Sequence, residues 1–92
     1  MNNFYLRFNR DIWSHSELTT EQKLILNFTW NFEVKAGYCY ASNSYMSEVF
    51  GLPEYRVLSV INELVDLDLI SIKWKDDVRF LVVNKKKYSI EE

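Results

Sequence analysis

The sequence has few of the residues that build small chemical centres: one Cys, one His, one Pro and two Gly among 92 residues. A single Cys cannot close an internal disulfide, and a single His cannot assemble a histidine metal site. Two glycines are too few for a loop that cradles phosphate. No apolar run approaches the roughly 18 to 20 residues that a membrane span needs. We therefore expect no disulfide, no metal, no cofactor and no membrane segment.

Apolar residues make up 48% of the chain and aromatic residues 16%, which is the composition of a folded protein and not of a disordered one. Because a domain needs roughly 50 residues or more to build its own core, we expect one domain over residues 1–92. The first thirteen residues carry charges within their apolar part and lack a small-residue cleavage site. They do not resemble a signal peptide, so a cytoplasmic location is expected.

The first half of the chain predicts a strand, a helix and a short extended segment. Residues 4–8 are aromatic-rich and favour a short strand. Thr19 and Gln22 have the spacing of a capping box, and apolar residues at helical spacing follow, so we expect a helix over about residues 20–33. Residues 38–40 follow a glycine and are too short for anything but a brief extended segment, which we expect to pair with a later strand.

Two further helices are indicated in the middle of the chain. Residues 42–44 offer N-cap side chains, and the apolar face that follows stops at Gly51. Pro53 suits the first turn of the next helix, which we expect to reach about residue 67 or 68 with Val57, Ile61 and Leu64 facing inward.

The last two extended runs, residues 69–75 and 78–84, are rich in β-branched and aromatic residues and predict a β-hairpin. Asp76 and Asp77 separate them, and a polar hairpin turn explains this pair better than a metal site does. Two helices joined by a tight turn and followed by a hairpin define a winged helix-turn-helix. The expected fold class is α+β, mainly α, divided into a leader (1–18), a helical core (19–68), a wing (69–84) and a basic tail (85–92).

The run from Leu18 to Ile70 also resembles a family, the winged-helix domains at the N-termini of bacterial, plasmid and phage replication initiators and replisome organisers. The similarity lies in a capping residue like Ser42, a helix-closing glycine like Gly51 and a wing entry like Leu69-Ile70. The resemblance implies double-stranded DNA as the partner and a third helix that enters the major groove. It departs from the family where DNA-binding members carry Arg or Lys at the start of that helix.

Charge is distributed unevenly along the chain, although the net charge is only −2. The predicted third helix, residues 53–68, carries one Arg against four acidic residues, and exposed carboxylates there repel phosphate. Residues 69–90 carry six basic residues against two acidic ones, so a local patch on the wing and tail can contact backbone phosphates.

Two functions follow, and the sequence leaves both open. The first is double-stranded DNA binding, of the replication-initiator or transcription-regulator kind. Its predicted contacts are Ser42, Asn43, Ser44, Tyr55, Arg56, Ser59, Asn62, Lys73, Lys75, Arg79, Lys85, Lys86 and Lys87. Each group of residues also has an explanation without DNA. Residues 42–44 can serve as helix caps, and the third helix and the lysine run can be ordinary solvated surface.

The second function is a protein-interaction module on the same fold, which docks on a host or phage replication or transcription protein or associates with itself. The acidic third helix and the surplus of aromatic residues favour it. Leu26 and Trp30 are the predicted contacts of a homodimer, against the alternative that such residues cover the leader and wing. His15 lies between two serines, but no acid is set to orient its ring. We therefore predict no catalytic residue and no enzyme.

Overall fold

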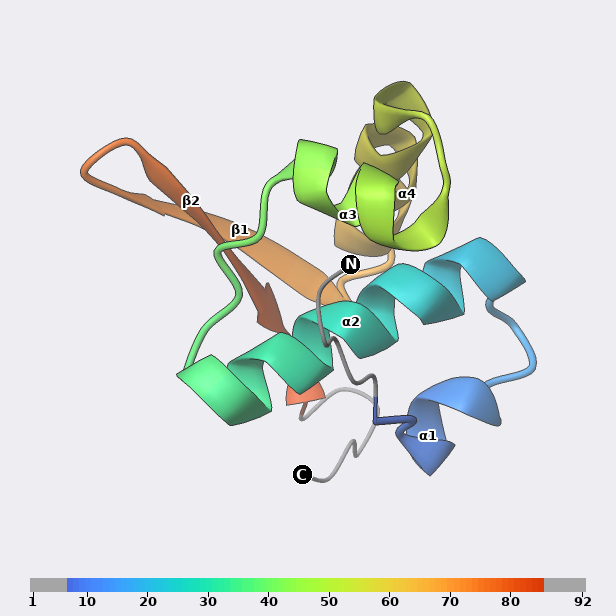
Figure 1. Cartoon of the computed structure of the whole chain (residues 1–92). Helices are drawn as coiled ribbons and strands as arrows, with labels where there is room; N and C mark the ends of the chain where they lie inside the picture. The colour runs from blue at the N-terminus through green and yellow to red at the C-terminus, as the bar shows by residue number, and fades with distance from the viewer. Residues whose placement is uncertain (1–6, 86–92) are drawn as a thin grey trace.

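The computed structural model describes residues 7–85 and arranges four helices and a hairpin around one core. The elements in chain order are α1 (Arg10–Trp13), α2 (Thr20–Ala36), α3 (Asn43–Phe50), α4 (Glu54–Asp66), β1 (Ile70–Lys75) and β2 (Val78–Val83). Helix α2 runs through the middle of the molecule, with α1 on one side, α3 and α4 on the other, and the hairpin projecting away from the bundle (Figure 1). The predicted mainly α winged helix-turn-helix is confirmed.

Helix α2 begins at the predicted capping box. The Thr19 hydroxyl accepts from the Gln22 backbone N–H at 3.1 Å, and the Gln22 side-chain oxygen accepts from the Thr19 N–H at 3.0 Å. The helix continues three residues beyond the predicted end at Glu33 and stops where Gly37 adopts φ 89°, a left-handed conformation that glycine adopts without strain.

The leader is not a strand in the part that the structure describes. Residues 4–6 of the predicted strand lie outside the described residues, and Arg7 and Phe8 carry no strand pairing. The chain turns at Asn9 instead, whose side chain accepts from the N–H groups of Asp11 and Ile12 and so caps the short helix α1. The strand prediction for positions 7 and 8 is therefore wrong, because side chains of α2 bond the N–H and the carbonyl of Arg7 in place of a neighbouring strand.

A buried asparagine of α2 holds this leader in place. The Asn27 side-chain oxygen accepts from the Asn9 N–H at 2.7 Å, and its amide donates to the Arg7 carbonyl at 2.7 Å. The side-chain oxygen of Asn31 accepts a weaker bond from the Arg7 N–H at 3.4 Å. These bonds satisfy the backbone of an irregular segment that lies over a buried helix, where unpaired polar groups are costly.

The two residues predicted as dimer contacts are buried within the monomer. Leu26 and Trp30 are 1% and 2% exposed and belong to the core of the monomer. The guanidinium of Arg7 lies 5.5 Å from the centroid of the Trp30 ring and helps to cover it. Since both side chains are already buried by their own chain, the prediction that they contact a second copy is wrong.

The later elements follow the sequence predictions closely. Helix α3 has Ser42 as its N-cap and Gly51 as its left-handed C-cap. Pro53 is the N-cap of α4 instead of its first residue, and the helix ends at Asp66. β1 and β2 pair antiparallel with Ile70 opposite Val83. The predicted extended segment joins them, because the Leu81 N–H donates to the Cys39 carbonyl at 2.8 Å.

We predict that Asn27→Ala lowers the free energy of unfolding by about 2 kcal/mol, because it leaves the buried N–H of Asn9 and the Arg7 carbonyl without partners. Urea denaturation followed by far-UV circular dichroism measures the change. Asn62→Ala is the matched control, since Asn62 is an exposed helical asparagine, and it should change stability by less than about 0.5 kcal/mol. Equal effects of the two substitutions would contradict the role assigned to Asn27.

Candidate nucleic-acid interface

The helix-turn-helix consists of α3, the turn at residues 51–53 and α4. Gly51 adopts φ 67° and its N–H donates to the Ser47 carbonyl at 2.9 Å. The Ser47 hydroxyl donates to the Leu52 carbonyl across the same turn, and Leu52 packs against the core. These contacts fix the angle at which α4 leaves the turn. The second helix of such a unit is the one that lies along a DNA groove.

The exposed face of α4 is defined by what the other face buries. Val57, Val60, Ile61 and Leu64 are all fully buried. A helix turns about 100° per residue, so positions 55, 59 and 62 fall within one narrow sector on the opposite side. Tyr55 is 76% exposed, and Leu58 is an exposed apolar residue close to this sector.

Three polar side chains on this face make no hydrogen bond to the described part of the chain. Within residues 7–85, Tyr55, Ser59 and Asn62 neither donate nor accept a side-chain hydrogen bond. Hydroxyl and amide groups in this arrangement are suited to base edges in a major groove, where Ser bonds to several bases and Asn pairs with adenine. We define Tyr55, Ser59 and Asn62 as the reading face.

The predicted residues at the start of α3 have structural partners, except for Ser44. The Ser42 hydroxyl accepts from the Tyr45 N–H at 3.0 Å, which is an N-cap bond. The Asn43 side-chain oxygen accepts from Arg79 at 2.6 Å, and Arg79 also donates to the Ala41 carbonyl at 2.8 Å. Ser44 is exposed in the first turn of the helix.

Arg79 therefore ties the wing to the helix-turn-helix. Partial burial of its guanidinium lowers the pKa of Arg79 from its usual value. The loss of hydration is offset by the bonds to Asn43 and Ala41, both of which lie at the entry to α3. This side chain fixes the position of the hairpin relative to α3.

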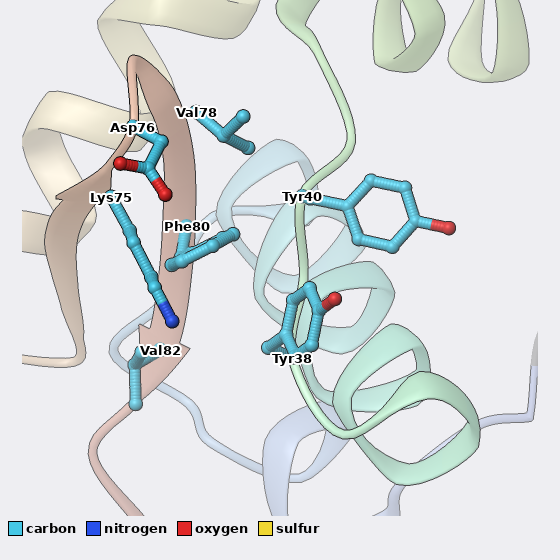
Figure 2. Close-up of a pocket in the computed structure, with 7 residues that line it drawn as sticks. All are labelled: Tyr38, Tyr40, Lys75, Asp76, Val78, Phe80 and Val82. Carbon is cyan, nitrogen blue, oxygen red and sulfur yellow. The ribbon is translucent and has the colours of Figure 1, made fainter.

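The register of the hairpin separates its basic residues. Lys73 lies opposite Phe80 and Lys75 opposite Val78, whereas Arg79 lies opposite Trp74. Side chains of directly opposed residues share a face, and neighbours along a strand alternate. Lys73 and Lys75 thus project from the face that carries Phe80, where Figure 2 shows the Lys75 side chain. The structure brings the two lysines together and places Arg79 on the other face.

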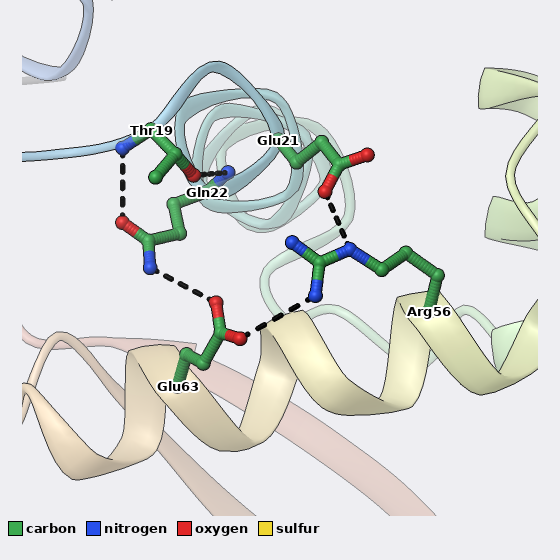
Figure 3. A network of polar contacts seen from close by, with 5 residues as sticks. All are labelled: Thr19, Glu21, Gln22, Arg56 and Glu63. Carbon is green, nitrogen blue, oxygen red and sulfur yellow. Dashed lines mark hydrogen bonds and ion pairs between the residues drawn. The ribbon is translucent and has the colours of Figure 1, made fainter.

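Arg56 is not on the reading face. Its Nε donates to Glu21 of α2 at 2.6 Å, and its Nη1 lies 3.5 Å from Glu63, which Gln22 also bonds at 3.0 Å (Figure 3). The hydrogen bond to Glu21 is the largest cause of a raised pKa for Arg56, so the guanidinium stays charged. This network joins the start of α2 to α4.

The position of Arg56 beside Glu63 can be found from the sequence alone. Arg56 and Glu63 are seven residues apart and so lie on the same side of α4, about 100° around the helix from Tyr55. The outward Leu58 could likewise be found from its spacing to Tyr55 and Asn62. The partner Glu21 could not be found in this way, because it comes from a different helix.

The lysine run of the tail begins at the edge of the described residues. Lys85 lies 3.8 Å from the carboxylate of buried Glu33, whose other oxygen accepts from the Val83 N–H at 3.4 Å. Lys86 and Lys87 lie outside the described residues. The structure thus places Lys85 against α2.

The structure also gives information on the Cys39 thiol, on metal-binding clusters and on membrane-spanning helices. Burial raises the pKa of Cys39 to about 11, so this thiol is protonated near neutral pH and is a poor nucleophile. Over residues 7–85, no cluster of three or more His, Cys, Asp or Glu side chains is arranged to hold a metal ion. None of the helices described here combines the length and apolarity required to cross a membrane.

The α3–turn–α4 geometry with its hairpin defines a winged helix-turn-helix as the class of protein. A family model described as "Helix-turn-helix domain" matches residues 16–70, more than half of the chain. The chain therefore belongs to this helix-turn-helix family. Membership indicates DNA binding as the class of function, in a family that is typically non-enzymatic. Comparisons with curated proteins and with solved structures gave no match.

We predict that Arg79→Met lowers the free energy of unfolding by about 1–2 kcal/mol, because two charge-assisted hydrogen bonds to the start of α3 are lost. Lys75→Met removes an equal charge from the exposed face of the same hairpin and should change stability by less than about 0.5 kcal/mol. Urea denaturation of both variants tests the difference. If Lys75→Met were as destabilising, Arg79 would have no special role in holding the wing.

The Cys39 thiol should react with a disulfide reagent such as DTNB far more slowly in the folded protein at pH 8 than in urea, where its pKa returns to the usual value near 9 and the thiol becomes accessible. The increase of the folded-state rate should continue toward pH 11. Stopped-flow absorbance measures both rates. Equally fast reaction of the folded and unfolded protein would show that Cys39 is not buried.

Proposed function

We propose that this domain binds double-stranded DNA with α4 in the major groove, as a replication-initiator-like or transcription-regulator-like module. The observation that carries the proposal is the reading face, because Tyr55, Ser59 and Asn62 lie in one sector of the second helix of the helix-turn-helix and have no partner within the described chain. The initiator-like part rests on the resemblance of residues 18–70, and the regulator-like alternative uses the same geometry.

Phosphate contacts in this proposal come from two places. Ser44 and the capping Ser42 lie at the N-terminus of α3, where backbone N–H groups and the helix dipole favour an anion. Lys73 and Lys75 are exposed on the wing and form no ion pair within residues 7–85. Arg56 supports α4 from the α2 side in this account, and Arg79 supports the wing.

The charge of α4 determines how strongly the domain is expected to bind DNA. Glu54, Glu63 and Asp66 outnumber Arg56 on this helix. Each exposed carboxylate opposes the approach of phosphate and releases no counterion. Binding to mixed sequence should therefore be weak, and discrimination should depend on hydrogen bonds from the reading face and little on general electrostatic attraction.

A mixed-sequence duplex titrated at 50 and 200 mM salt gives the first test, with fluorescence anisotropy as the readout. Each phosphate contact contributes about 0.9 to the slope of log affinity against log salt. Replacing Lys73 and Lys75 with Ala together should reduce the slope by about 1.8. Arg10→Ala removes a cation from α1, remote from the hairpin in Figure 1, and should leave the slope unchanged. Failure of the unaltered protein to bind at 50 mM salt would refute the proposal.

Once a preferred site has been selected from random duplexes, Asn62→Ala should reduce discrimination at one base pair by about 1–3 kcal/mol while binding to mixed sequence stays the same. Competition anisotropy against single-base variants of the site measures this. Arg10→Ala serves again as the control for the protein's general charge. Undiminished discrimination by Asn62→Ala would remove this residue from the reading face.

A protein-interaction module is the second candidate, and the exposed Leu58 beside Tyr55 on an acidic helix favours it. Large apolar side chains that are exposed on a helix anchor protein interfaces. Its partner would be a basic surface of a replication or transcription protein, or a second copy of this chain. In that case DNA retention would be absent at low salt, and Leu58→Ala would weaken the partner complex.

A further inference from the structure

The outer face of the wing carries a row of aromatic side chains that the helix-turn-helix does not use. Tyr38, Tyr40, Phe80, Val78 and Val82 line an open groove, and Lys75 and Asp76 border it. Figure 2 shows the Tyr38 and Phe80 side chains next to each other, with the Lys75 side chain on the other side of Phe80. We call this surface the aromatic groove.

The backbone forces these rings outward. Cys39 pairs with Leu81 and is completely buried, so its neighbours Tyr38 and Tyr40 must point to the opposite face of the sheet. Their exposed fractions are 47% and 51%. Phe80 is next to Leu81 on β2 and projects to the same side. The exposure therefore follows from the pairing that completes the core.

The rings are also held in position. The Tyr38 centroid lies 4.9 Å from that of Phe80 and 5.5 Å from that of Tyr40, and Tyr40 lies 5.1 Å from Phe32 in an edge-to-face contact. Preorganised rings lose little freedom when a flat group stacks on them.

The charged residues around the aromatic groove indicate which kind of ligand it binds. Lys73 and Lys75 lie on the same face as Phe80 and Val78, and Asp76 is the acidic group at the tip end of the groove. Two ammonium groups beside exposed rings fit a ligand that is both flat and anionic. Single-stranded nucleic acid combines these properties, because bases stack on aromatic side chains while lysines contact the phosphates.

We infer that the aromatic groove binds single-stranded DNA or RNA, with bases stacked on Tyr38, Tyr40 and Phe80 and phosphates near Lys73 and Lys75. A second copy fits less well, since a two-fold interface would bring two lysines from each copy together. The inference goes beyond duplex binding by α4. The two sites share only the lysines, so the aromatic residues separate them.

The test is anisotropy of a labelled dT12 oligonucleotide at 50 mM salt, compared with a 12-nucleotide strand of the same charge that lacks bases. Binding of dT12 should exceed that of the abasic strand by at least about fivefold, because each stacked base contributes to affinity. Tyr38→Leu should lower dT12 affinity by at least about fivefold. The matched control Tyr55→Leu, on α4, should leave it unchanged. Asn62→Ala should not affect dT12, which distinguishes this site from the reading face.

Equal affinity for the abasic strand, or dT12 binding that survives Tyr38→Leu, would overturn the inference. So would a dimer in sedimentation velocity without nucleic acid that Tyr38→Leu dissociates, since the groove would then be an interface between copies. A crosslinking measurement on the unaltered protein covers the case in which Tyr38→Leu fails to fold. Photocrosslinks from 5-iodouracil in the oligonucleotide should map to Tyr38, Tyr40 or Phe80. Crosslinks confined to other elements would equally overturn it.

Discussion

The structure depends on the burial of one helix from nearly every side. Seven consecutive residues of α2, from Ile25 to Asn31, are buried, whereas an ordinary surface helix buries only one stripe. Two polar members of this run bond within the chain: the Thr29 hydroxyl donates to the Ile25 carbonyl at 2.8 Å, and Asn27 bonds the leader. A helix of this kind is stable only when other segments cover all of its faces.

Each covering segment is fixed to α2, and this determines which surfaces remain for function. The leader is held by Asn27, α4 by the ion pair of Arg56 with Glu21, and β2 by the bond of Val83 to Glu33. The side of α4 that faces away from α2 is left uncovered, and it carries the reading face. The wing is positioned in turn by Arg79, which ties the projecting hairpin to the start of α3.

Much of the fold could be predicted because its signals are local. The capping box at Thr19, the caps at Ser42 and Gly51 and the Asp76-Asp77 turn each lie within a few residues of what they determine. The structure of the leader cannot be predicted in this way, because it depends on Asn27, eighteen residues away from Asn9.

The candidate site was harder to predict for the same reason. Tyr55, Ser59 and Asn62 follow from helix spacing alone. The hydrogen bonds of Arg56 to Glu21 and of Arg79 to Asn43 join residues that are 35 and 36 positions apart in the sequence. No local pattern can therefore predict them. The burial of Leu26 and Trp30 likewise requires knowing that the leader covers the side of α2 opposite Phe28. Long-range pairing decides which polar residues are free to bind a ligand.

We propose above that the uncovered side of α4 is the surface that contacts DNA. The most direct measurement is a titration of the ¹⁵N-labelled protein with a short duplex, followed by NMR chemical shifts of the backbone amides. The account predicts that the largest shifts lie in α4 around Tyr55, Ser59 and Asn62, with smaller ones at the start of α3 and in the wing. Shifts confined to α1, α2 and the leader, or none at saturating duplex, would contradict it.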